Sequence, residues 1–134
     1  MRVIRRVYVE SWQIQCCGDE FALRSKVEWT VVADPDLEFL SAVLGSHEAD
    51  AITDIEEHHG LMQLRDEPLI GTVHGITAVF CSYAAPSTGK ALYPVSGTAV
   101  LEPRERADGW EQEDAHTRVF VGYLVDVDDE SKRT

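Results

Sequence analysis

The side chains in this sequence that are best suited to bind a metal ion or to act in catalysis occur as two pairs of adjacent residues. Cys16 and Cys17 lie in the segment Trp-Gln-Ile-Gln-Cys-Cys-Gly at 12–18, and His58 and His59 precede a glycine much further along the chain. Thiolates and imidazoles are protein ligands that zinc prefers, and both groups also act as nucleophiles or bases. These four residues are therefore the candidate metal ligands, and zinc is the candidate ion.

The cysteine pair is compatible with four interpretations. Adjacent side chains on a strand point to opposite faces, so both thiols reach one metal ion only if Gly18 makes a turn. The pair also lacks the two-residue spacing of a zinc knuckle. A vicinal disulfide would close a strained ring, and a nucleophilic cysteine needs a base that only folding can bring near. In the fourth interpretation the thiols only pack, one buried and one half exposed.

The histidine pair has a structural and a chemical interpretation. At the C-terminal end of a helix the dipole favours histidine, and Gly60 would end that helix. A zinc site would instead combine one cysteine and one histidine of the two pairs with His74, Cys81 or an acid from 54–57. Such a site is expected in a pocket that has Trp12 as a wall.

Trp12 and Trp110 are the candidate binding residues. Trp12 borders the cysteines, and Trp110 lies in an acidic stretch, residues 102–116, that is predicted to be a long exposed loop. Exposed tryptophans are frequent anchors of protein interfaces. The chain contains no phosphate-binding glycine loop, no Gly-x-Ser-x-Gly elbow and no His-Glu-x-x-His helix, so no catalytic motif assigns an activity.

Length and composition are typical of one soluble globular domain. The 134 residues predict a single β-barrel-like domain at 1–127 and a frayed tail at 128–134. No apolar run reaches the ~20 residues that cross a membrane, and no secretory signal is expected at the N-terminus. The three cysteines do not form a disulfide framework, so the cytoplasm is the expected location.

The formal net charge of −12 is concentrated in two segments. Residues 34–67 hold ten acids against one base, and residues 102–130 hold ten acids against three bases. Nucleic acids are bound by Lys and Arg that neutralise phosphates, so this distribution argues against a nucleic-acid partner. The acidic segments are either solubilising faces or a surface for a basic protein partner.

Five segments are predicted to be strands, namely 2–10, 24–32, 69–83, 93–101 and 117–127. Alternation places three apolar side chains of 24–32 on one face, and it places Val119, Val121, Tyr123, Val125 and Val127 of the last segment on one face. Gly71 and Gly75 predict a bulge or a bend in the third segment.

Helical signals are confined to one part of the chain. Asp34 as N-cap, Pro35 at the first position and Gly45 at the end predict a helix over 35–44. Residues 48–59 fit a short helix, which we expect, or a strand. The elements together predict a mainly β fold, a small partly open antiparallel β-barrel (OB- or SH3-like) with one or two short helices inserted after the second strand.

The segment at 12–18, together with Phe21, Val27-x-Trp29, the histidine pair and the Gly71-x-Val73 strand, resembles a family of small bacterial proteins. These proteins occur mainly in actinomycetes and are classed as a domain of unknown function. The resemblance covers roughly residues 7–127. It implies a bacterial cytoplasmic protein, and it brings no activity, substrate or catalytic residue with it.

Two classes of function follow from these observations. The acidic segments and the missing catalytic motif favour a non-enzymatic acidic interaction module that binds a protein partner. The alternative is a small metal- or thiol-dependent protein that uses the Cys16/Cys17 and His58/His59 pairs.

Overall fold

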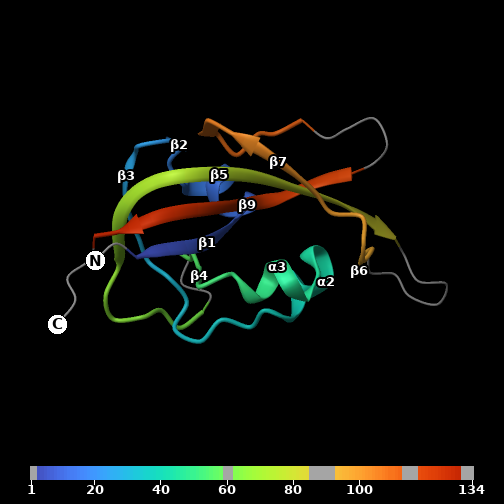
Figure 1. The fold of residues 1–134 in the computed structure, drawn as a ribbon, viewed down its shortest axis with the longest axis horizontal. Helices are drawn as coiled ribbons and strands as arrows, with labels where there is room; N and C mark the ends of the chain where they lie inside the picture. The colour runs from blue at the N-terminus through green and yellow to red at the C-terminus, as the bar shows by residue number, and fades with distance from the viewer. Residues whose placement is uncertain (1–2, 59–61, 85–92, 113–117, 131–134) are drawn as a thin grey trace.

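The computed structural model describes residues 3–58, 62–84, 93–112 and 118–130 of the chain. Its main sheet has the strand order β3 (Lys26–Trp29), β5 (Leu69–Ala84), β9 (Arg118–Asp129), β1 (Ile4–Glu10) and β4 (Asp54–Ile55). Neighbouring strands in this path are antiparallel except for β1 and β4, which are parallel. Figure 1 shows β5 and β9 as long curved strands that run side by side along the molecule.

Shorter elements complete the fold. The strands β6 (Tyr93–Pro94) and β7 (Val100–Arg104) pair with β5, and β2 (Phe21–Ala22) pairs with β8 (Arg106–Ala107). The helices are α1 (Ser11–Cys17), α2 (Glu38–Leu44) and α3 (Ser46–Asp50). None of the helices in the described part of the chain has the length and apolar character needed to cross a membrane.

The sheet curls until its two outer strands meet at one end. Residues 30–32 continue from β3, and residues 55–57 continue from β4. These two segments are joined by the bridge between Val31 and Glu56 and by backbone hydrogen bonds on both sides of it. Over residues 26–29, in contrast, β3 pairs only with β5 among the described residues. The predicted partly open barrel is confirmed, closed at one end and open beside β3.

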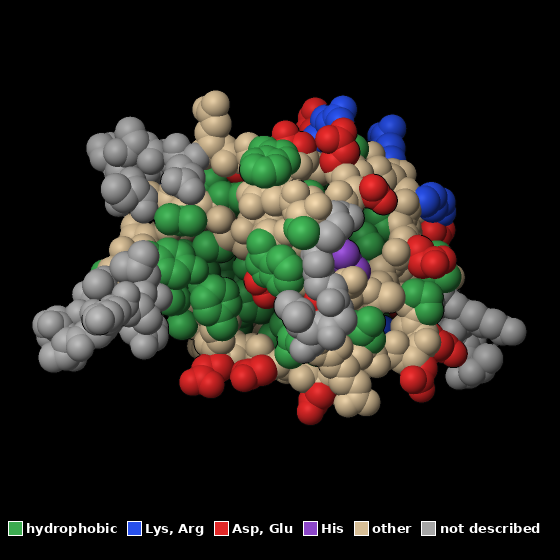
Figure 2. Space-filling view, turned by 180° about the vertical axis from the view of Figure 1, so that it is seen from behind, with side chains coloured by type: hydrophobic (Ala, Val, Ile, Leu, Met, Phe, Trp, Pro, Cys, Tyr) green, Lys and Arg blue, Asp and Glu red, His purple; other side chains and the backbone are tan. Residues whose placement is uncertain are grey.

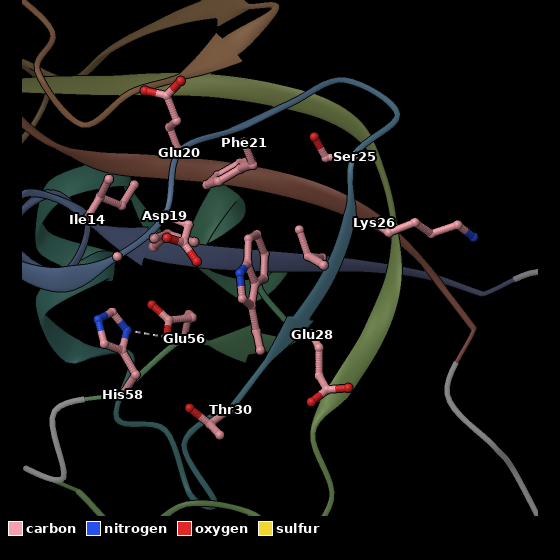
Figure 3. Close-up of a pocket in the computed structure, with 14 residues that line it drawn as sticks. Ile14, Asp19, Glu20, Phe21, Ser25, Lys26, Glu28, Thr30, Glu56 and His58 are labelled. Atoms are coloured by element: carbon pink, nitrogen blue, oxygen red, sulfur yellow. Dashed lines mark hydrogen bonds and ion pairs between the residues drawn. The ribbon is translucent and has the colours of Figure 1, made fainter.

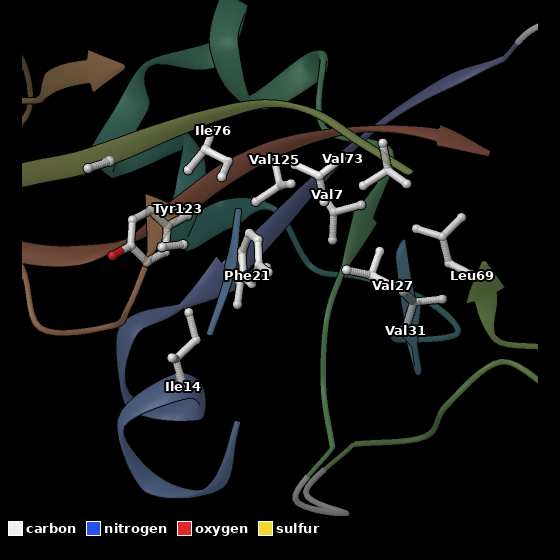
Figure 4. Packing of buried hydrophobic residues seen from close by; sticks show 14 of the residues in the cluster. Val7, Ile14, Phe21, Val27, Val31, Leu69, Val73, Ile76, Tyr123 and Val125 are labelled. Carbon is white, nitrogen blue, oxygen red and sulfur yellow. The ribbon is translucent and has the colours of Figure 1, made fainter. Parts of the chain in front are cut away.

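Two apolar clusters lie on the two faces of this sheet. The inner cluster contains Val7, Phe21, Val73 and Tyr123 among others and fills the curl of the sheet (Figure 4). The outer cluster packs Tyr8 and Leu124 of the sheet against Leu40 and Val43 of α2. Both faces of the middle of β1 and β9 are therefore buried, which explains the unbroken run of non-charged residues at 7–9 in β1 and at 119–125 in β9.

The strand predictions hold except in one segment and at one residue. The predicted single strand at 93–101 is wrong, because these residues form β6 at 93–94 and the start of β7 at 100–104, with a turn at 96–97 between them. The predicted irregularity near Gly75 is confirmed, because the register of β5 against β9 shifts between Val73 and Gly75. A second shift pairs Phe80 with Phe120 and Val79 with Gly122, which leaves Val121 as an extra residue. The prediction that Val121 shares a face with Tyr123 is therefore wrong, since the bulge turns it to the outer cluster.

The predicted helix at 35–44 is confirmed in its second part. The helix α2 begins at Glu38, whose backbone N–H donates to Asp36 Oδ1 over 2.9 Å, so the carboxylate at the start is that of Asp36 rather than Asp34. Gly45 ends α2 with φ of +86°, as predicted. The left-handed region is open to glycine without steric cost.

Three segments differ from their predictions. Residues 11–17 form the helix α1, which no end-capping or charge signal marks in the sequence. Residues 48–59 are helical only in α3, and the chain is extended from Asp54 to Glu56, so the interpretation of His58 as a helix end is wrong. Residues 102–116 are not one long loop, because β7 and β8 occupy its first part.

Candidate functional site

A cleft of about 400 Å³ opens where β3 and β1 lie apart. Its lining comes from β1, α1, the turn that follows α1, β2, β3 and the residues after β4, with the members Val9, Ile14, Gly18, Asp19, Glu20, Phe21, Ser25, Lys26, Val27, Glu28, Trp29, Thr30, Glu56 and His58 (Figure 3). This volume falls within the range of about 300–1,000 Å³ that is usual for ligand sites.

The floor of the cleft is aromatic. The rings of Phe21 and Trp29 meet edge to face, with their centroids 5.1 Å apart. Phe21 in turn meets Tyr123 of the inner cluster at 6.2 Å, which anchors the floor to the core. Trp29 is only half buried, and no hydrogen bond of its indole N–H is made with another described residue. The floor therefore offers aromatic faces and one N–H donor to a ligand.

Carboxylates surround this floor and are only partly balanced by cations. Asp19, Glu20, Glu28 and Glu56 line the cleft with one lysine, Lys26. The ammonium of Lys26 lies 2.6 Å and 2.8 Å from the two carboxylate oxygens of Glu130, and Figure 3 shows this side chain directed away from Glu56.

Two of the lining carboxylates have no cationic partner among the described residues. Glu20 pairs with Arg106 at 2.5 Å, so its charge is balanced outside the cleft. Asp19 and Glu28, in contrast, form no ion pair within the part of the chain that the structure describes. A carboxylate without a cationic partner among the described residues attracts a cation through its charge.

Glu56 and His58 form the polar end of the cleft. Nδ1 of His58 lies 2.7 Å from Oε2 of Glu56, whose side chain is only 5% exposed. Burial raises the pKa of Glu56, and the hydrogen bond and charge of His58 oppose this rise. The position of the pair follows from the bridge between Val31 and Glu56, which holds this segment against the continuation of β3.

Replacement of Glu56 by glutamine is expected to change how stability depends on pH. The pKa of Glu56 is raised by folding, so its contribution is favourable below the unfolded value near 4.5 and is lost as pH rises through the folded pKa. The free energy of unfolding of the Glu56→Gln variant, taken relative to that of the wild type, should therefore increase as the pH is raised from 4 to 7. Urea unfolding across this range measures it, with exposed Glu105→Gln as matched control. An equal difference at both pH values would contradict it.

A buried contact joins the cysteine-containing segment at 12–18 to the segment that contains His58. Gln13 of α1 is 2% exposed, and its Nε2 donates to Oε1 of Glu57 over 2.9 Å. Its Oε1 accepts the backbone N–H of His58 at 3.4 Å. The cysteine-bearing helix and the histidine segment are thus neighbours, and an amide rather than a thiol connects them.

The four candidate metal ligands are distributed as follows. His58 lines the cleft, whereas Cys16 is exposed on α1 and is absent from the lining. Cys17 belongs to α1, but its side chain lies outside the described part of the structure, as does His59. Among described residues, no group of three or more His, Cys, Asp or Glu side chains is arranged to hold a metal ion. Cys81, a candidate further ligand of the predicted zinc site, is fully buried in the outer cluster.

The two candidate binding tryptophans lie outside the cleft. Trp12 is 38% exposed on α1, and its Nε1 donates to Oε2 of Glu10 over 2.7 Å. Trp110 is 67% exposed at the turn after β8, as expected for a surface aromatic residue. The sequence did not identify Asp19, Glu28 or Trp29 as site residues. The only signal was the alternation of 24–32, which places an acid and an aromatic ring on opposite sides of one strand.

Comparison with known proteins gives one match. A family model described as a family of unknown function (DUF6578) matches residues 3–129. No curated protein and no solved structure matches the chain. The predicted resemblance to a domain of unknown function is confirmed at this level, and the match includes every residue that lines the cleft.

Proposed function

The chain belongs to this family of unknown function, and we propose that it is a non-enzymatic binding protein that holds a basic segment of a partner protein in the cleft. The observation that supports this function best is the pairing of an aromatic floor with two carboxylates, Asp19 and Glu28, that lack a cation among the described residues.

The cleft has the chemistry to recognise a lysine or arginine side chain. An apolar side chain of a basic segment can lie on Phe21 and Trp29, while the charged end of a neighbouring lysine or arginine reaches Asp19 or Glu28 at the rim. An anionic ligand would meet four lining acids with only one lysine to offset them, and that lysine is engaged by Glu130. Charge therefore favours a cationic group.

The wider surface supports the same choice of partner. The net charge of −12 accelerates the encounter with a basic protein. On the face shown in Figure 2, Asp and Glu side chains lie along the bottom, the right and the top of the rim, Lys and Arg side chains join them at the upper right, and hydrophobic side chains gather toward the middle. The same charge repels nucleic acids, which we propose are not partners. The bacterial cytoplasm, which the family resemblance implies, is the location that we propose.

Binding of lysine- and arginine-rich peptides, measured by calorimetry, tests this function. The double variant Asp19→Asn/Glu28→Gln should bind about tenfold more weakly, because two rim charge pairs of up to ~1 kcal/mol each are lost. The double variant Glu67→Gln/Glu105→Gln is the matched control, since it removes the same charge from exposed positions outside the cleft.

The control variant should keep most of the affinity, and binding should weaken as salt is added. Equal losses in both double variants would mean that only net charge matters and that the cleft is not the site. Absence of binding to any basic peptide at low salt, or tighter binding to a DNA oligonucleotide than to the peptides, would refute the proposed function.

A further inference from the structure

The strand β3 has one edge that faces β5 and one edge that faces the cleft. In the antiparallel pair with β5, Val27 lies opposite Gly71 and Trp29 lies opposite Leu69. The backbone C=O of the neighbouring Ile70 accepts a hydrogen bond from Glu130, on the β9 side of β5. Backbone groups alternate in direction along a strand, so the N–H and C=O of Gly71 point to β3 and bind Val27.

The same alternation fixes the direction of the even-numbered residues of β3. The C=O of Thr30 accepts the N–H of Glu57 at 3.0 Å, and the N–H of Val32 donates to Ile55 at 2.9 Å, both on the side away from β5. The backbone groups of Lys26 and Glu28 therefore point to this side too. No described segment pairs with β3 there over residues 26–29. Residues 55–57 fill the strand position beside residues 30–32. Further along β3 the same position is open and forms the cleft, and we call this open position the lane.

We propose that the basic segment of the partner binds in this lane as an added β-strand on the open edge of β3. This inference rests on the proposed function and specifies how the partner is held. Backbone hydrogen bonds to Lys26 and Glu28 would supply affinity, and the lining side chains would supply specificity. The bound segment would extend the ladder that Thr30 and Glu57 already begin.

The alternation of β3 also specifies the partner sequence. Side chains of the added strand that lie beside Val27 and Trp29 would point to the aromatic floor, and those beside Glu28 would point outward to its carboxylate. The chemistry that fits is an extended peptide in which apolar and basic residues alternate. Lysines on open edges usually prevent strand addition. Lys26 is drawn to Glu130 instead, which leaves the edge accessible.

Binding of a short synthetic peptide in which lysine alternates with valine tests this mode. N-methylation of the peptide amides that face β3 removes their hydrogens without changing charge, so it should weaken binding about tenfold or more. Methylation of the other alternate set should weaken it much less. Hydrogen exchange of the Lys26 and Glu28 amides should slow when the peptide binds.

A variant of the protein itself supplies the second arm. Glu28→Pro removes the N–H that faces the lane and leaves the bonds between β3 and β5 in place, because proline is tolerated on edge strands in this orientation. It should bind the peptide more weakly than Glu28→Gln, which removes only the charge. Circular dichroism checks that both variants fold.

The outcomes separate the two proposals. If the unmethylated peptide binds, and binding depends on Asp19 and Glu28 but is unaffected by either pattern of methylation, the strand-addition mode is wrong and the proposed function stands. If the peptide binds and one methylation pattern abolishes binding with slower exchange at Lys26 and Glu28, the mode is supported. If the alternating peptide does not bind but other lysine- or arginine-rich peptides do, the mode is wrong and the proposed function stands. If no basic peptide binds, both fail.

Discussion

Replacement of Gly71 by alanine is expected to destabilise the protein by about 3 kcal/mol, near the upper end of what overpacking costs. A Cβ at this position would lie 2.3 Å from the backbone carbonyl oxygen of Asp128 and 2.6 Å from Cγ1 of Val127. Both atoms belong to β9, the central strand of the sheet, so relief of the clash requires that β5 and β9 move apart. Urea unfolding followed by fluorescence measures the loss.

Gly75→Ala is the matched control on the same strand. Its Cβ would meet Oδ2 of Asp126 at 3.2 Å, and this atom is the end of a side chain that is about one-third exposed. We expect a change of less than about 1 kcal/mol, as is usual for substitutions whose neighbours can move. Similar losses in both alanine variants would show that the close approach of β5 and β9 at Gly71 does not limit the fold.

Asp54→Asn is expected to cost about 2–3 kcal/mol of unfolding free energy, because it removes the charge of a buried carboxylate that two arginines share. Asp54 is 2% exposed and accepts Nε and Nη2 of Arg5 at 2.9 Å and 3.1 Å. Nη1 of Arg65 lies 3.3 Å away. The hydrogen bond with Asp54 raises the pKa of Arg5. Because arginine stays protonated at neutral pH even without that partner, the variant leaves both guanidinium charges without the carboxylate.

The ion pair of Arg6, which follows Arg5 in β1, supplies the control for the Asp54→Asn prediction. Arg6 pairs with Asp126 at 3.0 Å, and the Asp126 side chain is 35% exposed. Because an exposed ion pair contributes only about 0–1 kcal/mol, Asp126→Asn should cost far less than Asp54→Asn. Thermal or urea unfolding of the two variants at one pH compares them directly. Equal losses would show that burial of Asp54 adds nothing to its pairing.

The strands could be predicted from the sequence because burial imposes a period of two on them. Val27, Trp29 and Val31 were placed on one face correctly, since a single apolar cluster receives all three. The same rule failed at Val121, because the bulge depends on how β9 meets Phe80 of β5. A bulge is a property of two paired strands, and one strand considered alone does not contain it.

The helix α1 could not be predicted, because nothing local favours it. It has no side-chain hydrogen bond at its N-cap and no acidic residue in its first turn or basic residue in its last. Its position follows from tertiary contacts, in which Ile14 packs in the inner cluster and Gln13 binds Glu57. Burial of one face outweighs weak helix propensity in a helix this short.

The cleft was missed for a related reason. Its lining comes from stretches that are far apart in the sequence, and each carries only one or two of the residues that matter, such as Asp19, Glu28 and Glu56. The cysteine and histidine pairs are conspicuous in the sequence because adjacent identical residues of these types are unusual. Only His58 of the described members of those pairs lines the cleft, and the ordinary acids around an aromatic floor carry the proposed chemistry.

The pairing of β1 with β9 has a consequence for synthesis of the chain. Residues 4–10 align with residues 122–128, so the first strand finds its longest partner almost at the end of the domain. At translation rates of about 5–20 residues per second, β1 waits between roughly 6 and 24 s before β9 is made. During that interval the apolar residues Val7, Tyr8 and Val9 lack their partner strand, and this interval is longer than in a fold whose first strand pairs locally.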